Sequence, residues 1–222
     1  MSLVDANSDS PSLNALLTTS IVSDSLDTLG YRNQVLSTRL SPLVAGSRIF
    51  GRASTVQFAP SFTDMQEGPY DEAIRYIDLL EPGEVAVIAT DANLSTGYWG
   101  ELFSAAAIGR SVAGAITDGN IRDTPKIIPL GFPIFSAGRR PIDFRARMQV
   151  VSMHSTVQLG GVHVAHGDLI LADDDGTVVI PQKVELDVLS AAKERASTES
   201  AVLDELLSGA TLREVWDKYK VL

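Results

Sequence analysis

The middle of the chain alternates short apolar runs with segments rich in helix-forming residues. The runs Val85–Ala89, Val112–Thr117 and Phe132–Phe135 are brief and almost wholly apolar, which is typical of strands buried on both faces of a parallel sheet. Between them, Trp99–Arg110 favours a helix, and Thr124-Pro125 favours the start of a short one, because proline is tolerated in the first helical position. This order predicts a parallel βαβ unit with right-handed crossovers.

Short strands replace this alternation after Arg147. They are separated by Gly-Gly, His-Gly and Asp-Gly pairs, which are typical of hairpin turns. The expected strands are Met148–Ser152, Thr156–Leu159, Val162–Val164, Asp168–Ala172 and Thr177–Ile180. The sequence therefore predicts an α/β fold in which a C-terminal hairpin sheet follows the parallel unit.

Further helices and one more strand complete this fold. Apolar residues recur at helical spacing over Leu13–Leu29, and Gly30 stands where a glycine would cap the helix. We expect one domain over residues 13–222, after a flexible N-terminus over 1–12 that is polar and short of apolar anchors. The other expected elements are a strand at Ser54–Phe58 and helices at Tyr70–Leu80, Lys183–Leu207 and Leu212–Tyr219.

Charge and composition exclude several classes of protein. The formal net charge of −10 argues against a nucleic-acid-binding surface, which needs clustered Lys and Arg. With no cysteine, the chain can have neither disulfides nor thiolate-bound metals. It lacks a secretory signal, an apolar stretch of membrane-spanning length and a glycine-rich nucleotide motif, so we expect a cytoplasmic protein without a nucleotide cofactor.

Two segments follow the predicted parallel strands at the edge where ligands bind in such sheets. Thr90–Glu101 comes after one strand, and Asp118–Asp123 comes after the next. Ligands of open parallel sheets bind beyond the carboxyl ends of the strands. If the two strands are neighbours, Glu101 converges with Arg122 and Asp123 in one crevice.

The residue types in this crevice suit a small anionic substrate and a metal ion. A helix that begins near Gly100 would direct the free N–H groups of Glu101, Leu102 and Phe103 at a carboxylate. Arg122 offers a planar cation for bidentate carboxylate binding. Asp123 is a hard oxygen ligand for Mg²⁺ or Mn²⁺, and the Glu101 carboxylate can act as a base. The alternative is a solvated Arg-Asp pair beside a glutamate that the helix dipole favours.

Three other groups of residues suggest functional sites, but we consider these hypotheses weaker than the crevice at Glu101, Arg122 and Asp123. Asp173–Gly176 resembles a calcium loop but lacks the downstream glutamate of an EF-hand, so a charged hairpin turn is preferred. His163, His166 and Asp168 could hold a metal but fit a solvated turn better. Lys126 could serve a Schiff-base aldolase, but we expect it to be exposed, with an ordinary pKa.

The chain resembles the RraA-like family over nearly its whole length, and four segments carry this resemblance. That family includes regulators of ribonuclease E activity and class II pyruvate aldolases for 4-hydroxy-4-methyl-2-oxoglutarate and 4-carboxy-4-hydroxy-2-oxoadipate. The most specific signal is an acidic residue followed, after twenty positions, by Arg-Asp, here Glu101, Arg122 and Asp123. The four segments are WGELFSAAA, AGAITDGNIRDTPKI, LGFPIF and GDLILADDDGTVVIP.

This resemblance implies a fold, a chemistry and an assembly. The family's fold is a β/β/α swivelling-type domain, usually assembled as a homotrimer or a dimer of trimers. By resemblance, Asp123 binds the divalent metal, and Arg122 binds the pyruvyl carboxylate and enolate. Glu101 would orient or deprotonate a metal-bound water, and the backbone of Gly100–Phe103 would cradle the substrate. The implied activity is metal-dependent cleavage of carbon–carbon bonds in small 2-oxo acids, with oxaloacetate decarboxylation.

Two points of the resemblance stay open. The family's aldolases carry Asp where this chain has Glu101, which leaves the aldol substrate in doubt because base geometry is set to fractions of an ångström. They also take a carboxylate from a neighbouring subunit, and neither Glu194, Glu199 nor Glu205 can be matched to it. The alternative function is a non-catalytic protein-binding regulator of ribonuclease E type. The acidic residue at position 101 favours the enzyme, because regulators tend to lack it.

Overall fold

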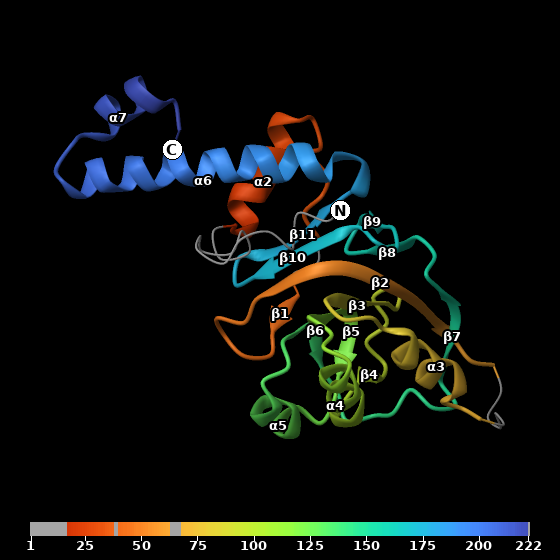
Figure 1. Cartoon of the computed structure of the whole chain (residues 1–222). Helices are drawn as coiled ribbons and strands as arrows, with labels where there is room; N and C mark the ends of the chain where they lie inside the picture. The colour runs from red at the N-terminus through yellow and green to blue at the C-terminus, as the bar shows by residue number, and fades with distance from the viewer. Residues whose placement is uncertain (1–16, 38–39, 63–67, 222) are drawn as a thin grey trace. The chain divides into compact units, whose positions relative to one another are not determined.

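The computed structural model describes residues 17–37, 40–62 and 68–221, and its contacts divide the chain into two compact units. The larger unit spans residues 33–182 and holds all the described strands (Figure 1). The smaller unit joins residues up to 32 with residues 183–222. The predicted flexible segment 1–12 lies outside the described residues, and the single domain over 13–222 stays a prediction.

The larger unit is built on one mixed sheet. Its strand order is β1-β6-β5-β3-β2-β10-β11, while β4 pairs with β5 and β7 pairs with β2. The pairs β2–β3, β3–β5 and β5–β6 are parallel, which confirms the predicted parallel unit. The strands are β1 (Ser41–Pro42), β2 (Ile49–Pro60), β3 (Glu84–Ala89), β4 (Gly97–Trp99), β5 (Gly114–Ile121), β6 (Ile134–Arg139), β7 (Met148–Met153), β10 (Leu169–Asp173) and β11 (Gly176–Ile180).

The apolar sequence of β3 explains why the sheet is covered on both faces. Alternate residues of a strand point to opposite faces. Val85, Val87 and Ala89 accordingly join one buried cluster, while Ala86 and Ile88 join the other. Each fully buried valine or isoleucine of this kind stabilises the fold by about 1.5–3 kcal/mol.

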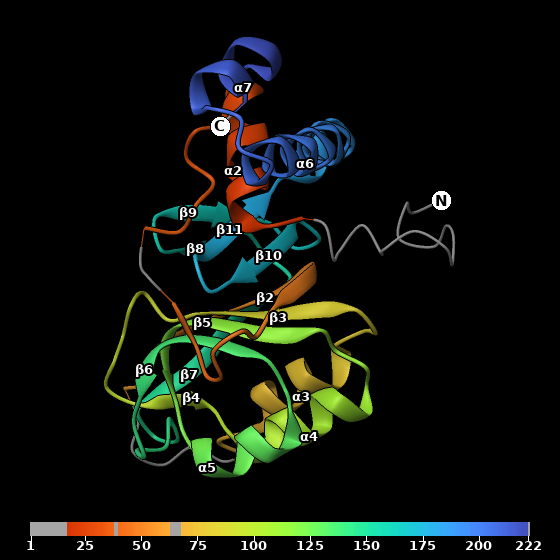
Figure 2. The ribbon, with the colours of Figure 1, turned by 90° about the vertical axis from the view of Figure 1, so that its left-hand side faces the viewer.

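Different elements cover the two faces. Helices α3 (Asp71–Leu79) and α4 (Glu101–Gly109) lie on one face, where Ala73, Tyr76 and Ile77 of α3 enter the cluster of Ala86 and Ile88 (Figure 2). The other cluster takes its apolar residues partly from a two-stranded hairpin, β8 (Val157–Leu159) and β9 (Val162–Val164). Two short helices follow β5, namely α5 (Thr124–Ile127) and the 3₁₀ turn η2 (Ile128–Leu130).

Strands β2 and β5 are longer than the sequence pattern predicts, and β6 runs from Ile134 to Arg139 where Phe132–Phe135 was expected. β2 extends beyond Ser54–Phe58 because it is paired along both edges, with β3 on one side and with β10 and then β7 on the other. β5 continues to Ile121, so residues 118–121 belong to a strand and not to the loop that we expected. The buried Asp118 is satisfied there, because its carboxylate accepts the backbone N–H groups of Thr90 and Ala92.

The smaller unit is helical. It contains α2 (Thr19–Thr28), α6 (Glu185–Leu207, after the 3₁₀ turn η3 at Gln182–Val184) and α7 (Leu212–Tyr219). Gly30 has φ +86°, and its N–H donates to Asp27 while that of Tyr31 donates to Leu26, so the predicted glycine cap of α2 is confirmed. None of the described helices is long and apolar enough to cross a membrane.

Candidate active site

The predicted convergence of the two loops depends on neighbouring strands, and that premise is correct. β3 and β5 pair in parallel, so their carboxyl ends meet at one edge of the sheet. β4 pairs with the end of β5, and the ladder continues as the Arg122 N–H donates to the Trp99 carbonyl at 2.9 Å. Because α4 begins two residues after Trp99, this pairing brings Glu101 close to Arg122 and Asp123.

Gly100 allows this close approach. A Cβ atom at position 100 would lie 2.7 Å from Asp123 Oδ2 and 3.3 Å from Arg122 Cγ. The backbone of Gly100 has φ −151°, which any residue can adopt, so space and not conformation requires a glycine. The start of α4 therefore packs directly against the Arg-Asp pair.

Two carboxylates hold the Arg122 guanidinium. Its Nε lies 3.3 Å from Asp123 Oδ2, and its Nη1 lies 3.0 Å from Asp143 Oδ2. No group among the described residues bonds to its second terminal nitrogen, Nη2. The Arg122 side chain is 34% exposed and that of Asp123 is 39% exposed, so the pair is only partly shielded from solvent and the alternative of a solvated Arg-Asp pair stays open.

Asp123 stands at the point where β5 gives way to α5. Its φ of 56° and ψ of 27° are left-handed, a conformation uncommon outside glycine that Asp tolerates better than most residues. Its backbone carbonyl accepts from the N–H groups of Lys126 and Ile127 and so begins the short helix. The carboxylate itself remains 39% exposed beside Arg122.

Lys126 differs from our expectation. Its Nζ lies 3.0 Å from Glu101 Oε2, because the third residue of α5 faces the first turn of α4. The hydrogen bond and the charge of Glu101 raise the pKa of Lys126 above its ordinary value, so the predicted ordinary pKa was wrong. The predicted exposure is confirmed, since 68% of the side chain is accessible. A raised pKa keeps the amine protonated, which disfavours Schiff-base chemistry.

The sequence reasoning missed Tyr70 and Asp143. Tyr70 Oη donates to Asp143 Oδ2 at 2.5 Å, and the Arg145 N–H donates to Oδ1 at 3.0 Å. Burial, together with this hydrogen bond, raises the pKa of Tyr70. Burial also acts to raise the pKa of Asp143, but the hydrogen bonds from Tyr70 and the Arg145 backbone and the charge of Arg122 lower it on balance. No local pattern marks either residue.

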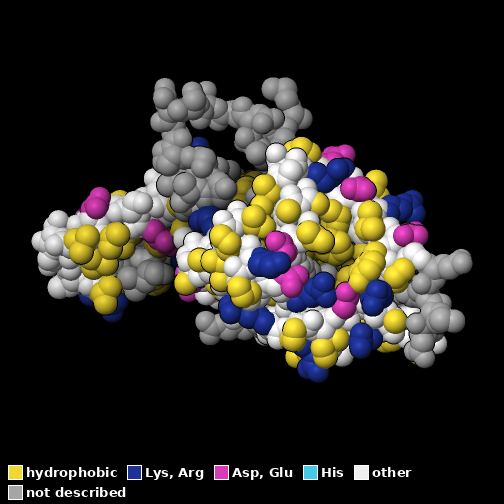
Figure 3. Space-filling model, turned by 90° about the horizontal axis from the view of Figure 1, so that it is seen from below, with side chains coloured by type: hydrophobic (Ala, Val, Ile, Leu, Met, Phe, Trp, Pro, Cys, Tyr) yellow, Lys and Arg dark blue, Asp and Glu magenta, His cyan; other side chains and the backbone are white. Residues whose placement is uncertain are grey.

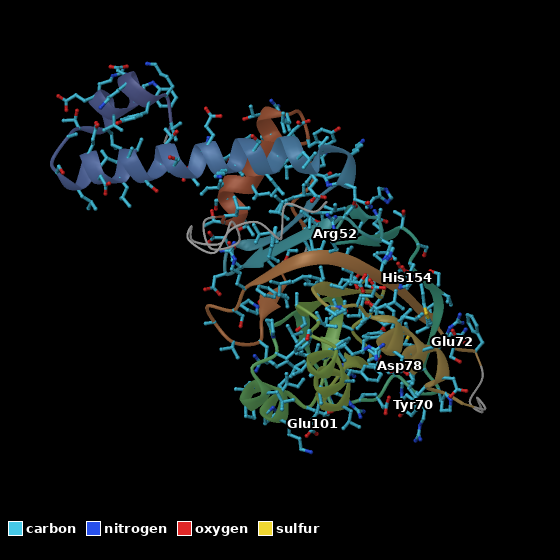
Figure 4. The ribbon with its side chains drawn as sticks, in the orientation of Figure 1. Arg52, Tyr70, Glu72, Asp78, Glu101 and His154 are labelled. Carbon is cyan, nitrogen blue, oxygen red and sulfur yellow. The ribbon has the colours of Figure 1, made fainter. Side chains whose placement is uncertain are left out.

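These side chains surround a cavity of about 610 Å³ on the side of the sheet where α4 and α5 lie. Figure 4 labels Tyr70 and Glu101 on this side, and Figure 3 shows acidic and basic side chains close together among apolar ones there. All the predicted site residues line it. The lining residues are Tyr70, Ile74, Gly97, Tyr98, Trp99, Gly100, Glu101, Leu102, Phe103, Arg122, Asp123, Lys126, Asp143 and Phe144.

The donor chemistry of this cavity fits a hard divalent cation. Asp123 and Glu101 both present partly exposed carboxylates to it. Within the described residues, no three His, Cys, Asp or Glu side chains cluster closely enough to hold a metal. A metal at Asp123 would therefore complete its coordination with water or substrate, which Mg²⁺ readily does.

The other two weaker candidates do not line this cavity. Asp173–Gly176 forms the turn between β10 and β11, as expected, and Asp174 accepts from the Gly46 N–H. Asp168 is buried, so the predicted solvated turn was wrong for this residue. Its carboxylate accepts the N–H groups of Ala165 and Gln182. His163 is exposed on β9, and His166 stacks on His154 with ring centroids 4.2 Å apart.

Comparison with known proteins finds relatives that match most of the chain. The chain is 28% identical over 198 residues to the protein DlpA of Legionella pneumophila, covering 89% of this chain but only 32% of DlpA. It is 31% identical over 183 residues to a Halalkalibacterium halodurans protein named "putative 4-hydroxy-4-methyl-2-oxoglutarate aldolase", covering 82% of this chain and 81% of that protein.

A solved structure and a family model extend the comparison to the fold. Streptomyces coelicolor RraAS2, described as an unusual member of the RNase ES inhibitor RraA protein family, superposes with a TM-score of 0.73 at 26% identity. The match covers 88% of this chain and 97% of that one, which agrees with the predicted swivelling-type α/β fold. The model of the RraA-like family, described as Aldolase/RraA, matches residues 19–179. The chain belongs to the RraA-like family.

Proposed function

We propose that the protein is a divalent-metal-dependent lyase that cleaves carbon–carbon bonds of small 2-oxo acids through a pyruvate enolate. The observation that carries this proposal is the convergence of Arg122, Asp123 and Glu101 on one cavity at the start of α4. Relatives named as aldolases of such an acid support the same reaction class.

In this proposal the cation and the helix terminus bind the substrate's anionic end. The first N–H groups of α4, at Glu101, Leu102 and Phe103, lack partners within the helix and can bind a carboxylate. Nη2 of Arg122 supplies two further N–H groups, which stabilise the negative charge that develops as the enolate forms. Asp123 would hold Mg²⁺ or Mn²⁺, a Lewis acid that polarises the 2-oxo group.

Glu101 is the proposed base. Lys126 holds its Oε2 oxygen, which leaves Oε1 to accept a proton directly or through a water. In retro-aldol cleavage the proton comes from the carbinol hydroxyl, whose oxygen becomes the carbonyl of the leaving fragment. Oxaloacetate decarboxylation forms the same enolate without that proton transfer.

An assay of the purified protein against a panel of 2-oxo acids tests the function. The panel includes 4-hydroxy-4-methyl-2-oxoglutarate and oxaloacetate, with Mg²⁺ or Mn²⁺ present, and pyruvate release is measured with a coupled dehydrogenase. The Arg122→Ala protein serves as the blank, because it removes the proposed enolate-stabilising cation. Pyruvate release no faster than this blank for every acid would refute the lyase.

Glu101→Gln should slow retro-aldol cleavage much more than it slows oxaloacetate decarboxylation. We expect retro-aldol kcat to fall by about 10²–10⁴-fold, the usual contribution of a general base, and oxaloacetate decarboxylation to fall much less. Glu72→Gln is the matched control, since Glu72 also stands in the first turn of a helix but outside the cavity. Equal losses in both reactions would contradict the assignment of Glu101 as the base for the hydroxyl proton.

Gly100→Ala should impair the reaction through steric displacement. The new Cβ would lie 2.7 Å from Asp123 Oδ2, so the carboxylate must shift, and kcat/KM should fall by about 100-fold. Gly109→Ala, at the other end of α4, is the control because its Cβ would meet nothing within 4 Å. Steady-state kinetics of both variants check this, and a Gly100→Ala enzyme as active as Gly109→Ala would show that the contact is unimportant.

A protein-binding regulator of ribonuclease E type remains the second candidate function. The similarity to RraAS2 favours it, as does the exposed apolar Leu102 at the mouth of the cavity. Inhibition of ribonuclease E cleavage that persists in the Arg122→Ala protein, combined with the absence of lyase activity, would support this reading over the enzyme.

We also propose that the protein assembles as a homotrimer or a dimer of trimers, with its sites at subunit interfaces. One side of the cavity is open, and enolate chemistry favours shielding from bulk water, which a neighbouring copy could provide. Light scattering should give a multiple of the 23.7 kDa subunit for the active protein. A fully active species with the mass of one subunit would contradict an interface site.

A further inference from the structure

The Asp143 carboxylate has three partners, one of which is Arg122. Its Oδ2 accepts both Arg122 Nη1, at 3.0 Å, and Tyr70 Oη, at 2.5 Å, while its Oδ1 accepts the Arg145 N–H at 3.0 Å. The lowered pKa of Asp143, where these bonds outweigh burial, and the pKa of Tyr70, raised chiefly by burial, keep one group ionised and the other protonated. Asp143 is therefore a fixed acceptor and a poor base.

Both residues are anchored in the body of the larger unit. The ring of Tyr70 packs edge-on against Phe144 at 5.5 Å, and Phe144 packs in the same way against Phe58 of β2 at 5.3 Å. The backbone beside Asp143 is tied to β4, because the Gly97 N–H donates to the Ile142 carbonyl at 2.7 Å. Since β4 is itself paired with β5, Asp143 is held at a set distance from the end of the strand that carries Arg122.

Because two of its three nitrogens are engaged, the Arg122 guanidinium can offer mainly Nη2 to the cavity. A guanidinium has two edges that can bind a carboxylate, one formed by Nε and Nη2 and the other by Nη1 and Nη2. Asp123 contacts Nε on the first edge, and Asp143 contacts Nη1 on the second. Nη2, which belongs to both edges, has no such partner within the described part of the chain. A guanidinium freed on the Asp143 side could rotate about its long, flexible stem. The orientation of Nη2 then depends on the hydrogen bond to Asp143 and, through Asp143, on Tyr70.

We propose that Tyr70 and Asp143 are positioning residues that fix the plane of the Arg122 guanidinium for binding the carboxylate and enolate of a 2-oxo acid. The inference rests on the proposed lyase function. Neither residue needs to touch the substrate, because both act through Arg122.

The experiment compares Tyr70→Phe with Tyr76→Phe, and Asp143→Asn with Asp168→Asn. Tyr76 also belongs to the α3 region and loses a buried hydrogen bond, to the Ser54 carbonyl at 2.6 Å, but it lies outside the cavity. Asp168 is a buried carboxylate that accepts two backbone N–H groups, and it directly precedes β10, which β3 and β2 separate from β5 in the sheet. Each control thus removes a comparable structural interaction without the link to Arg122.

Three measurements are made on every variant: thermal unfolding, kcat and KM for oxaloacetate, and calorimetric binding of oxalate and of pyruvate. Oxalate is planar and dianionic, like the enolate, whereas pyruvate resembles the ground state. We expect kcat/KM to fall by about tenfold in Tyr70→Phe and about 100-fold in Asp143→Asn, with oxalate affinity weakened more than pyruvate affinity. Tyr76→Phe and Asp168→Asn should lower the Tm but leave kinetics and oxalate binding unchanged.

The outcomes distinguish a failure of this inference from a failure of the proposed lyase function on which it rests. An active wild-type protein whose Tyr70→Phe and Asp143→Asn variants lose only thermal stability, like the controls, would overturn the positioning role and leave the lyase standing. Equal losses of oxalate and pyruvate affinity would also overturn it, because they indicate general damage to the site. A wild-type protein that neither releases pyruvate nor binds oxalate would overturn the lyase and this inference together.

Discussion

Removal of divalent metal is expected to abolish pyruvate release, and addition of Mg²⁺ or Mn²⁺ is expected to restore it. Asp123 is the one protein ligand that the family resemblance and the cavity both indicate, and no cluster of three potential ligands exists among the described residues. A metal that a single protein carboxylate holds would keep several waters and exchange readily, so a chelator should remove it without unfolding the chain. The assay compares protein dialysed against EDTA with the same sample after each metal is returned.

Asp123→Asn provides the matched control for metal removal. The amide keeps the size of the side chain but loses the charge that favours a divalent cation, so neither metal should restore activity to this variant. Binding of Mn²⁺, followed by electron paramagnetic resonance, should be lost in Asp123→Asn and retained in Asp27→Asn, where the changed carboxylate lies outside the cavity. Full activity in protein shown to be metal-free would refute the metal-dependent mechanism.

Arg122→Lys should reduce kcat/KM by about two to three orders of magnitude, comparable with the loss of a donor to a developing oxyanion. Lysine keeps the positive charge but has a single nitrogen, which cannot engage Asp123 and Asp143 together and still present donors to a substrate. The loss should appear in kcat as well as in KM, because the proposed interaction strengthens as the enolate forms.

Arg110→Lys is the control for this exchange. Arg110 also uses several nitrogens, donating to the carbonyls of Leu80 and Asp78, but it lies outside the cavity. Its replacement should leave kcat/KM unchanged. If Arg122→Lys changed only KM, Arg122 would bind ground state and transition state equally, and the proposed enolate stabilisation would be wrong.

Much of the fold and the central part of the site follow from local sequence patterns. The apolar runs beginning at Val85 and Val112 indicate two parallel strands, because short continuous apolar runs are typical of strands buried on both faces. The order of such strands is constrained by right-handed crossovers, so the neighbouring loops could be expected to meet. Glu101, Arg122 and Asp123 could therefore be assigned to one crevice before the structure was known.

Only the tertiary structure decided how these groups are held. Asp143 and Tyr70 lie 73 positions apart, and their bond to each other and to Arg122 leaves no periodic or compositional trace. The pairing of Lys126 with Glu101, which raises the lysine pKa, likewise depends on the packing of α5 beside α4. Hydrophobic periodicity reports which face of an element is buried, because burial repeats along the chain. A single polar contact between distant segments does not repeat, so its geometry exists only once the chain is folded.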